Sequence, residues 1–433
     1  MANYYVGRKK RRGVSFGTWF MLAVTALTVC VGAWIFPRVS GGMEDVAAAS
    51  GALIQSLVAT AAPGATPAAV LRPTAEPTAA PTTPPPPQSR AVTLGVSGQI
   101  YLDNSLRKSG LLETGGYNYD SIFSVIAPYA SAVDAMMVTL ETTVTDTSPY
   151  DTYCAPSEIL TALKKAGVDI INLGTERILE EGFEGLNKTR AAVEMQGFSV
   201  TGAHRSVDEQ ALPLTFDLNG VKVAVLSYTY GLSTIGAKQG TRDQRAIAVN
   251  TIETTKIRQD VEAARGQGAN LVIVNMNWGK RTATKPAAAE IKIVDEIADC
   301  GVDVILGVHP SAAHKMERRE VTWADGSAHE VFVAYSLGNF LTNERETDQI
   351  VGMLLSLEFT LDPGADSARL TQATWLPTWV MRWDNGGYQY RILPAGTETQ
   401  PDEMTDSVFR NMRRAYESII KRFGDQAAAP VPE

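Results

Sequence analysis

One uncharged segment near the N-terminus constrains this chain most. Residues 14–36 read VSFGTWFMLAVTALTVCVGAWIF. About 20 apolar residues are enough for a helix to cross a bilayer, so this segment can span one. A basic cluster at residues 8–12 precedes it, and positive charge favours the cytoplasmic side. We therefore predict a cytoplasmic basic segment at 1–13 and a transmembrane helix at 14–36. The protein would be a single-pass protein of the cell membrane, with its C-terminal domain extracellular.

A cleaved signal peptide is the alternative interpretation of this segment. Such a peptide has an apolar core of about 7–15 residues, followed by a cleavage site with small residues. The run at 14–36 is longer and ends in Trp-Ile-Phe before Pro37, which favours an uncleaved anchor. The stretch 40–49 contains Ser and several Ala residues and leaves cleavage open.

Two further segments have compositions typical of disordered chain. Residues 37–90 consist mostly of Ala, Pro, Thr, Gly and Ser and end in PTAEPTAAPTTPPPPQSR. They offer too little apolar surface to offset the entropy lost on ordering, and the Pro-rich end favours extended polyproline II structure. We predict a disordered stalk at 37–90 and a disordered tail at 424–433.

The segment between stalk and tail has the pattern of an α/β domain. Short apolar runs such as 135–140, 221–228 and 271–276 suit strands that are buried on both faces. Helical patterns such as 286–300 alternate with them, which predicts α/β layers over 91–396. Apolar residues at helical spacing then predict an amphipathic C-terminal helix within 397–423; they are Met404, Val408, Met412, Tyr416, Ile419, Ile420 and Phe423.

Charge and cysteine content exclude some functions. The 39 basic and 47 acidic residues give a net charge of −8, which argues against a nucleic-acid partner because such proteins bind through Lys and Arg. Three cysteines are too few for a disulfide scaffold. Cys154 and Cys300 could pair outside the cell, but nothing in the sequence places them close together.

Six short motifs, in the expected order, carry a resemblance to a known family. They are Leu140-Glu141, the segments 167–169 and 182–186, Trp278-Gly279, the segment GVDVILGVHP at 301–310, YSLGNF at 335–340, and the closing strands at 377–380 and 390–394. From about Val92 to Pro394 the chain resembles the CapA-type poly-γ-glutamate capsule synthesis family, relatives of calcineurin-like metallophosphatases. The resemblance implies a metallophosphatase-like layered α/β/β/α domain.

The chain departs from the family's metal motifs at most positions. The family-motif positions, which we take as candidate site residues, are Gln99, Glu141, Arg177, Asn277, Trp278, His309, Ser336 and Asn339. At the positions where the resemblance implies metal ligands or their neighbours, the chain instead has Gln99, Thr139, Thr175, Glu176, Arg177, Asn277 and Ser311. Of the histidines in the family's metal motifs, it keeps only His309. A two-metal centre needs several anionic and imidazole ligands, and the Arg177 guanidinium cannot lose its proton. We therefore expect no cofactor, with room for at most one weakly bound divalent metal.

The remaining polar candidates admit two interpretations. Glu141, Glu176 and His309 are candidate catalytic residues that could flank a cleft. Alternatively, both carboxylates pair with Arg177 in a buried ion network, which we favour because opposite charges keep the strand-end loops neutral. We expect Asn339 to brace a turn rather than to react, and Asp103 to be a solvated loop residue.

Three functional hypotheses follow. The leading one is a membrane-anchored protein of capsule or poly-γ-glutamate-type polymer synthesis or export, not catalytic at the family metal site. Its partners would be the envelope polymer or polymer-synthesis membrane proteins. The second is a hydrolase of envelope polymers or phosphoesters with a non-standard site. The third is a structural or adhesion module of the cell surface.

Overall fold

The computed structural model describes residues 88–146, 150, 154–324, 326–424 and 429–430. The predicted basic segment, transmembrane helix and nearly all of the stalk lie outside these residues, as does most of the predicted tail. Within the described part of the chain, no helix is long and apolar enough to cross a membrane.

The larger of two main sheets is built around its central strand β1 (Arg90–Ile100). Its nine strands include the path β16 (Tyr388–Pro394), β15 (Arg369–Asp384), β14 (Val351–Leu361), β1, β2 (Ala135–Leu140), β5 (Ile170–Asn172) and β6 (Ser199–Thr201). Two short strands join it, since β13 (Asn339–Leu341) pairs with β1 and β17 (Ala429–Pro430) pairs with β15. Strand β1 is antiparallel to β14 and parallel to β2, so it is hydrogen-bonded on both sides.

The second main sheet has six strands. Their order is β11 (Met316–Thr322), β12 (Ala328–Ala334), β10 (Val304–Val308), β9 (Leu271–Asn277), β8 (Val221–Thr229) and β7 (Leu214–Leu218). The four inner strands are parallel, and the two edge strands are antiparallel to their neighbours. A small separate sheet consists of β3 (Thr143–Val144) and β4 (Cys154–Ala155).

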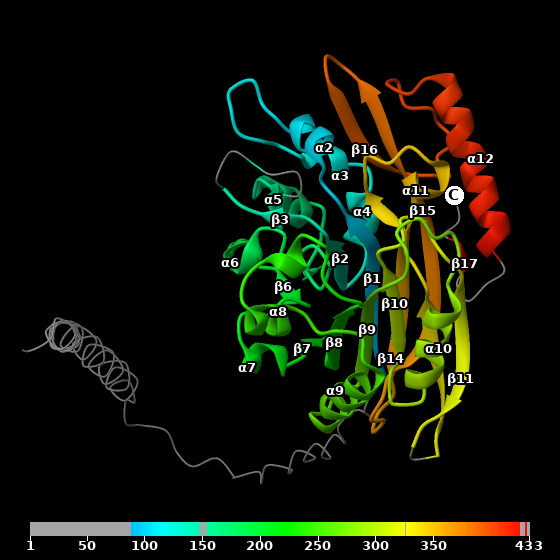
Figure 1. The fold of residues 1–433 in the computed structure, drawn as a ribbon. Coiled ribbons are helices and arrows are strands. Elements are labelled where there is room, and N and C mark those ends of the chain that lie inside the picture. The colour runs from blue at the N-terminus through cyan, green and yellow to red at the C-terminus, as the bar shows by residue number, and fades with distance from the viewer. Residues whose placement is uncertain (1–87, 147–149, 151–153, 325, 425–428, 431–433) are drawn as a thin grey trace, which may run out of the picture. The chain divides into compact units, whose positions relative to one another are not determined.

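Helices cover the outer faces of both sheets. The described helices are α2 (Asn104–Ser109), α3 (Asp120–Phe123), α4 (Ala127–Ala130), α5 (Glu158–Lys165), α6 (Gly182–Met195), α7 (Val207–Gln210), the 3₁₀ turn η1 (Gly236–Lys238), α8 (Arg242–Ala248), α9 (Thr254–Gly266), α10 (Ala288–Ile297), α11 (Thr347–Ile350) and α12 (Asp406–Phe423). One apolar core lies between the sheets, a second between the larger sheet and α2–α6, and a third between the smaller sheet and α9–α10. The layers are therefore α/β/β/α, as the resemblance implied (Figure 1).

The C-terminal helix packs into the core between the two sheets. Helix α12 buries Met412, Ala415, Ile419 and Phe423 and lies alongside the β14–β16 part of the larger sheet (Figure 1). The rings of Phe423 and Trp375 meet edge to face, with 6.1 Å between their centroids. The predicted amphipathic helix is therefore present and packs its apolar face as expected. Cys154 and Cys300 are both free thiols.

Candidate functional site

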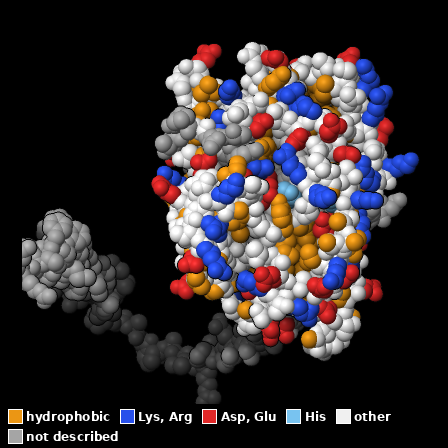
Figure 2. Space-filling view, viewed as in Figure 1, with side chains coloured by type: hydrophobic (Ala, Val, Ile, Leu, Met, Phe, Trp, Pro, Cys, Tyr) orange, Lys and Arg blue, Asp and Glu red, His pale blue; other side chains and the backbone are white. Residues whose placement is uncertain are grey.

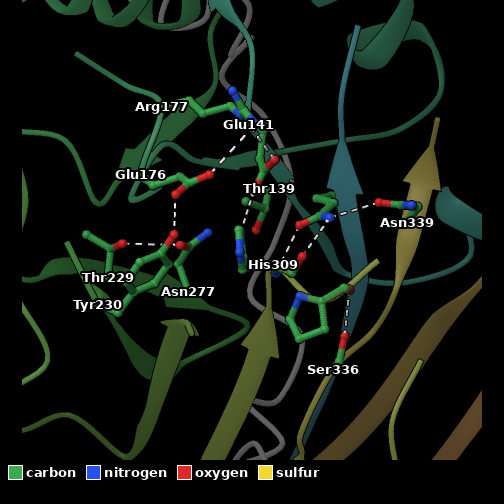
Figure 3. A network of polar contacts seen from close by, with 12 residues as sticks. Thr139, Glu141, Glu176, Arg177, Thr229, Tyr230, Asn277, His309, Ser336 and Asn339 are labelled. Carbon is green, nitrogen blue, oxygen red and sulfur yellow. Dashed lines mark hydrogen bonds and ion pairs between the residues drawn. The ribbon is translucent and has the colours of Figure 1, made fainter. Parts of the chain in front are cut away.

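The candidate residues converge at the carboxyl ends of the strands, where the two sheets meet. Gln99 lies near the end of β1, Glu141 follows β2, Asn277 ends β9 and His309 follows β10. Parallel strands place such ends at one edge, which is where open α/β sheets bind ligands. Figure 3 shows Glu141, Asn277 and His309 gathered at the strand ends of both sheets. The sequence motifs thus form one cluster in space, which we call the strand-end site.

The Gln99 side chain joins the two sheets through hydrogen bonds. Its Nε2 donates to the His309 carbonyl oxygen at 3.1 Å and to Asn339 Oδ1 at 2.8 Å, and its Oε1 accepts from the His309 N–H at 2.9 Å (Figure 3). Asn339 in turn donates from Nδ2 to the Gln349 carbonyl at 2.8 Å. Both side chains are buried. We call this arrangement of Gln99, His309 and Asn339 the Gln99 clasp; in it Asn339 links β1 to the chain at Gln349.

His309 has an unusual backbone conformation. Its φ is +92°, a left-handed value that glycine adopts far more readily than other residues. The two Gln99 hydrogen bonds hold its backbone in this state. Its imidazole is buried, 5.3 Å between ring centroids from Tyr230, and its Nδ1 lies 3.6 Å from Glu141 Oε1. Neither of these two atoms has a hydrogen-bond partner among the described residues.

Arg177 lies among three carboxylates. Its Nη1 is 3.0 Å from Glu180 Oε1, its Nε is 3.8 Å from Glu141, and its Nη2 is 3.8 Å from Glu176. Only 12% of the Arg177 side chain is exposed, against 5% for Glu141 and 3% for Glu180. The predicted pairing with Glu141 and Glu176 is therefore present. The shortest pair, with Glu180, was missed, although its spacing of three residues could have indicated it.

Burial and charge act in opposite directions on this cluster. Burial alone would lower the pKa of Arg177, but the neighbouring carboxylates, Glu141 foremost, outweigh it and raise that pKa. The pKa of Glu180 is raised, because its loss of solvent outweighs the contribution of Arg177. The guanidinium thus stays charged, and three acids share one cation.

Tyr230 forms the outer wall of the site. Its hydroxyl donates a hydrogen bond to Glu176 Oε2 (Figure 3). Burial, followed by this carboxylate, raises the pKa of Tyr230, so the phenol stays protonated. Its neighbour Thr229 donates to Asn277 Oδ1 at 3.1 Å. The Tyr230 bond ties the end of β8 to the loop that carries Glu176 and Arg177, and the Thr229 bond joins the ends of β8 and β9.

Beneath the site, buried amides form a layer that the sequence analysis missed. Asn172 Nδ2 donates to Thr139 Oγ1 at 3.1 Å and to Asn275 Oδ1 at 3.2 Å, and its Oδ1 accepts from Ser227 at 2.7 Å. These asparagines end or interrupt otherwise apolar strands, in IIN and VIVNMN. An Asn in a strand buried on both faces was the signal available.

The other two family-motif positions have structural contacts. The Trp278 indole donates to the Tyr335 carbonyl at 3.0 Å and stacks on the Tyr335 ring, with 6.1 Å between centroids. Ser336 Oγ donates to the Pro310 carbonyl at 3.0 Å and accepts from the Gly338 N–H at 3.1 Å. Both side chains are buried and hold the loops around the Gln99 clasp in place.

Asp103 lies in the loop after β1, as expected, but its carboxylate makes contacts that the sequence analysis missed. Its Oδ1 accepts from the N–H groups of Ser105 and Leu106 at 2.9 Å, so it caps the N-terminus of α2. Its Oδ2 accepts from Asn343 Nδ2 at 2.8 Å. A residue of this type immediately before a helix is a typical N-cap, and we overlooked α2 because only six residues form it.

The site does not fit the two-metal centre that the resemblance implies. The Gln99 side chain uses both its oxygen and its nitrogen within the clasp, and Arg177 holds a fixed positive charge among the acids. Within the described ranges, no three His, Cys, Asp or Glu side chains converge as metal ligands. Thr175, Asn277 and Ser311 each leave one buried polar atom without a hydrogen-bond partner among those residues. We therefore derive no metal-dependent step.

The surface above the site is hollowed and charged. Figure 2 shows a histidine at the bottom of a hollow near the centre of one face, with basic and acidic side chains around it. Tyr101 follows β1, and the guanidinium carbons of Arg177 and Arg281 each lie 5.4 Å from the centre of its ring. Arg281 also pairs with Glu344. Two arginines therefore lie over one tyrosine ring just after β1.

Comparison with known proteins identifies the family. Residues 93–344 match the family described as bacterial capsule synthesis protein PGA_cap. The chain belongs to this family. It is 24% identical over 266 residues to the capsule biosynthesis protein CapA of Bacillus anthracis. That match covers 59% of this chain and 61% of the relative. It is also 24% identical to the PGA biosynthesis protein CapA of Bacillus subtilis, over 52% of this chain and 57% of that protein. The matches thus span less than two thirds of each relative.

Solved structures give weaker matches. NAD nucleotidase of Haemophilus influenzae has a TM-score of 0.40 and 12% identity, and the match covers 76% of this chain and 56% of that one. A 5'-nucleotidase precursor from Thermus thermophilus has a TM-score of 0.37 and 13% identity, over 77% and 59% of the two chains.

Proposed function

We propose that this chain is a membrane-anchored extracellular protein of capsule or poly-γ-glutamate-type polymer synthesis or export, and that its strand-end site works without a metal ion. The family and the two capsule-biosynthesis relatives support the role in capsule formation. The basic cluster at 8–12 and the apolar run at 14–36 support the anchor. In this proposal the domain binds the polymer or the membrane proteins that make it.

The position of Arg177 supports a site that works without a metal ion. A guanidinium that is almost buried among Glu141, Glu176 and Glu180 supplies the positive charge that a metal ion would otherwise provide. Because the guanidinium cannot lose its proton, it opposes any divalent cation at this place. Arg177 thus partly offsets the charge of the three carboxylates. In this proposal the site stabilises the fold and contributes to binding.

A complementation experiment tests this role. In a strain that lacks the gene, the full chain should restore the envelope polymer, and His309→Ala should restore it as well. The purified full chain should contain far less than one zinc or manganese ion per molecule when no metal is added. Stoichiometric metal, together with loss of polymer in His309→Ala, would contradict the proposal. An unchanged polymer in the deletion strain would instead favour a structural or adhesion role.

A protease experiment tests the anchor. Protease added to intact protoplasts should remove the domain that begins near Ala91, while residues 1–13 remain protected. A mature soluble protein that starts near Ser40 would show cleavage of the N-terminal segment and refute the anchor.

One observation favours the hydrolase as a second candidate. The His309 Nδ1 and Glu141 Oε1 atoms are buried, 3.6 Å apart and without hydrogen-bond partners among the described residues. An imidazole beside a carboxylate can act as a general base. This candidate predicts hydrolysis of phosphoesters or γ-glutamyl polymers that is abolished by His309→Ala, whereas Arg177→Ala mainly changes turnover. No hydrolysis of either substrate class by the full chain would exclude it.

A further inference from the structure

A second polar cluster lies beside the rim of the strand-end site, where the loop after β13 meets the β15–β16 hairpin. Its centre is Asn343 Oδ1, which accepts from Arg345 Nη2 at 3.1 Å, Arg382 Nη1 at 3.2 Å and Tyr390 Oη at 2.7 Å. Three donors, two of them on cations, thus converge on one neutral oxygen. A second Arg345 bond, from Nε to the Asn343 carbonyl at 3.0 Å, fixes that guanidinium further.

The two arginines are only partly compensated by the acids around them, of which Asp103 acts on Arg345. Neither Arg345 nor Arg382 forms an ion pair within 4.0 Å among the residues that the structure describes. The nearby carboxylate of Asp103 instead accepts from Asn343 Nδ2 and from the first turn of α2. Partial loss of solvent and the neighbouring Arg382 lower the pKa of Arg345, while Tyr390 and Asp103 act in the opposite direction, and the Arg345 side chain is exposed. Two like charges are therefore held close together.

We infer that Arg345 and Arg382 form a binding site for the carboxylate groups of an extended acidic polymer. A guanidinium offers a planar fork of N–H groups that matches a carboxylate, and a bound anion would relieve the repulsion between the two cations. Arg382 lies 4.2 Å above the Tyr388 ring, and this aromatic side chain is 45% exposed, which gives the site an open apolar wall. The inference rests on the proposed function and names the chemistry that its polymer must present.

The position of the cluster favours a polymer over a small anion. Glu344, the residue before Arg345, pairs with Arg281, and Arg281 and Arg177 both lie over the Tyr101 ring. Arginine and tyrosine side chains therefore follow one another from the strand-end site to the β15–β16 hairpin. Repeated carboxylates on one chain could bind at Arg345 and Arg382 and extend past the exposed Tyr388 of the hairpin, whereas a single small anion would use only the arginine pair.

Binding of poly-γ-glutamate to the purified full chain in detergent tests the inference. The double variant Arg345→Gln/Arg382→Gln should weaken binding by about a hundredfold, since each charge-assisted contact contributes about tenfold. The matched control is Arg258→Gln/Arg369→Gln, which removes the same charge from exposed arginines that pair with Asp299 and Asp362. It should change the affinity less than about threefold, within the range of surface ion pairs. Arg382→Lys, which keeps the charge but loses the fork, should give an intermediate value.

Competition experiments distinguish the source of the anion. Free glutamate and inorganic phosphate, at the same concentration of anionic groups as the polymer, should compete poorly. Equal competition by either would overturn the polymer assignment in favour of a small-anion site. Equal weakening by the control pair, or no weakening by the Arg345/Arg382 pair when both variants unfold like the parent, would overturn the site itself. If the variant loses binding although gene deletion leaves the polymer unchanged, the proposed function fails and the site stands.

Discussion

Removal of the Arg177 guanidinium should destabilise the domain strongly. Arg177→Ala would leave Glu141, Glu176 and Glu180 close together without a cation, and at most 13% of any of these side chains is exposed. Breaking a buried ion pair by removing one partner costs about 3–5 kcal/mol. Two of the three contacts are 3.8 Å long rather than tight hydrogen bonds, so we expect the lower half of this range, about 3–4 kcal/mol.

The pH dependence of this loss gives a sharper test. Burial already raises the pKa of Glu180 with Arg177 present, and without the guanidinium the pKa should rise further. A raised pKa of a carboxyl group in the folded state destabilises the fold above the pKa of the unfolded state, about 4.3 for Glu, and has no effect well below it. The stability difference between Arg177→Ala and the parent should therefore be large at pH 7.5 and shrink as the pH falls toward 4.5.

Urea unfolding followed by tryptophan fluorescence measures these differences, provided that the slope with denaturant stays the same. Glu180→Gln is the matched control. It removes one of three acids around one cation, so it should change the free energy of unfolding by less than about 1 kcal/mol, and combining it with Arg177→Ala should recover part of the loss. An Arg177→Ala variant as stable as the parent at pH 7.5, or a loss that does not depend on pH, would refute the ion-network explanation.

Three further predictions concern single residues of the core and the site. Gln99→Ala should lower the free energy of unfolding by about 2–4 kcal/mol in urea titrations, because it leaves the His309 N–H and Asn339 Oδ1 buried without their partner; a loss below about 1 kcal/mol would contradict the clasp. His309→Gly should be more stable than His309→Ala by about 1–2 kcal/mol in the same assay, since only glycine adopts a φ of +92° without strain, and equal stabilities would argue against strain. Burial, and then Arg190, lower the pKa of His204 to about 4, so stability should fall as the pH drops from 6.5 to 4. Free energies of unfolding of the parent and of His204→Gln at pH 7 and pH 5 check this. An identical change of the free energy of unfolding with pH in both proteins would rule it out.

The apolar strands were predictable because each is a continuous run. The prediction of 135–140 coincides with β2, and those of 221–228 and 271–276 agree with β8 and β9 to within one residue. Helix α6 was missed because it begins with GFEG and its apolar residues form only a weak stripe. Strand β11 was missed because its sequence MERREVT is rich in charge, which an edge strand with one exposed face tolerates.

The composition of the site could be predicted from motifs, but its contacts could not. Gln99 and His309 are 210 positions apart, and their contact depends on how the two sheets pack, which no local pattern encodes. The role of Arg177 was accessible because a fixed charge at a ligand position needs partners nearby. The cluster of Arg345 and Arg382 escaped notice because Asn343 and Tyr390, which orient it, come from a loop and a strand far apart in the chain.

The central position of β1 bears on how the domain would respond to mechanical load. The described chain enters the fold through this strand, which is paired with β14 from Arg90 to Ser97 on one side and with β2 on the other. Tension applied ahead of Arg90 would pull the strand along its own length. Its hydrogen bonds run across that direction, so many would have to rupture together rather than open one after another from an edge. A pull from the N-terminal side would therefore load the hydrogen bonds on both sides of β1 together.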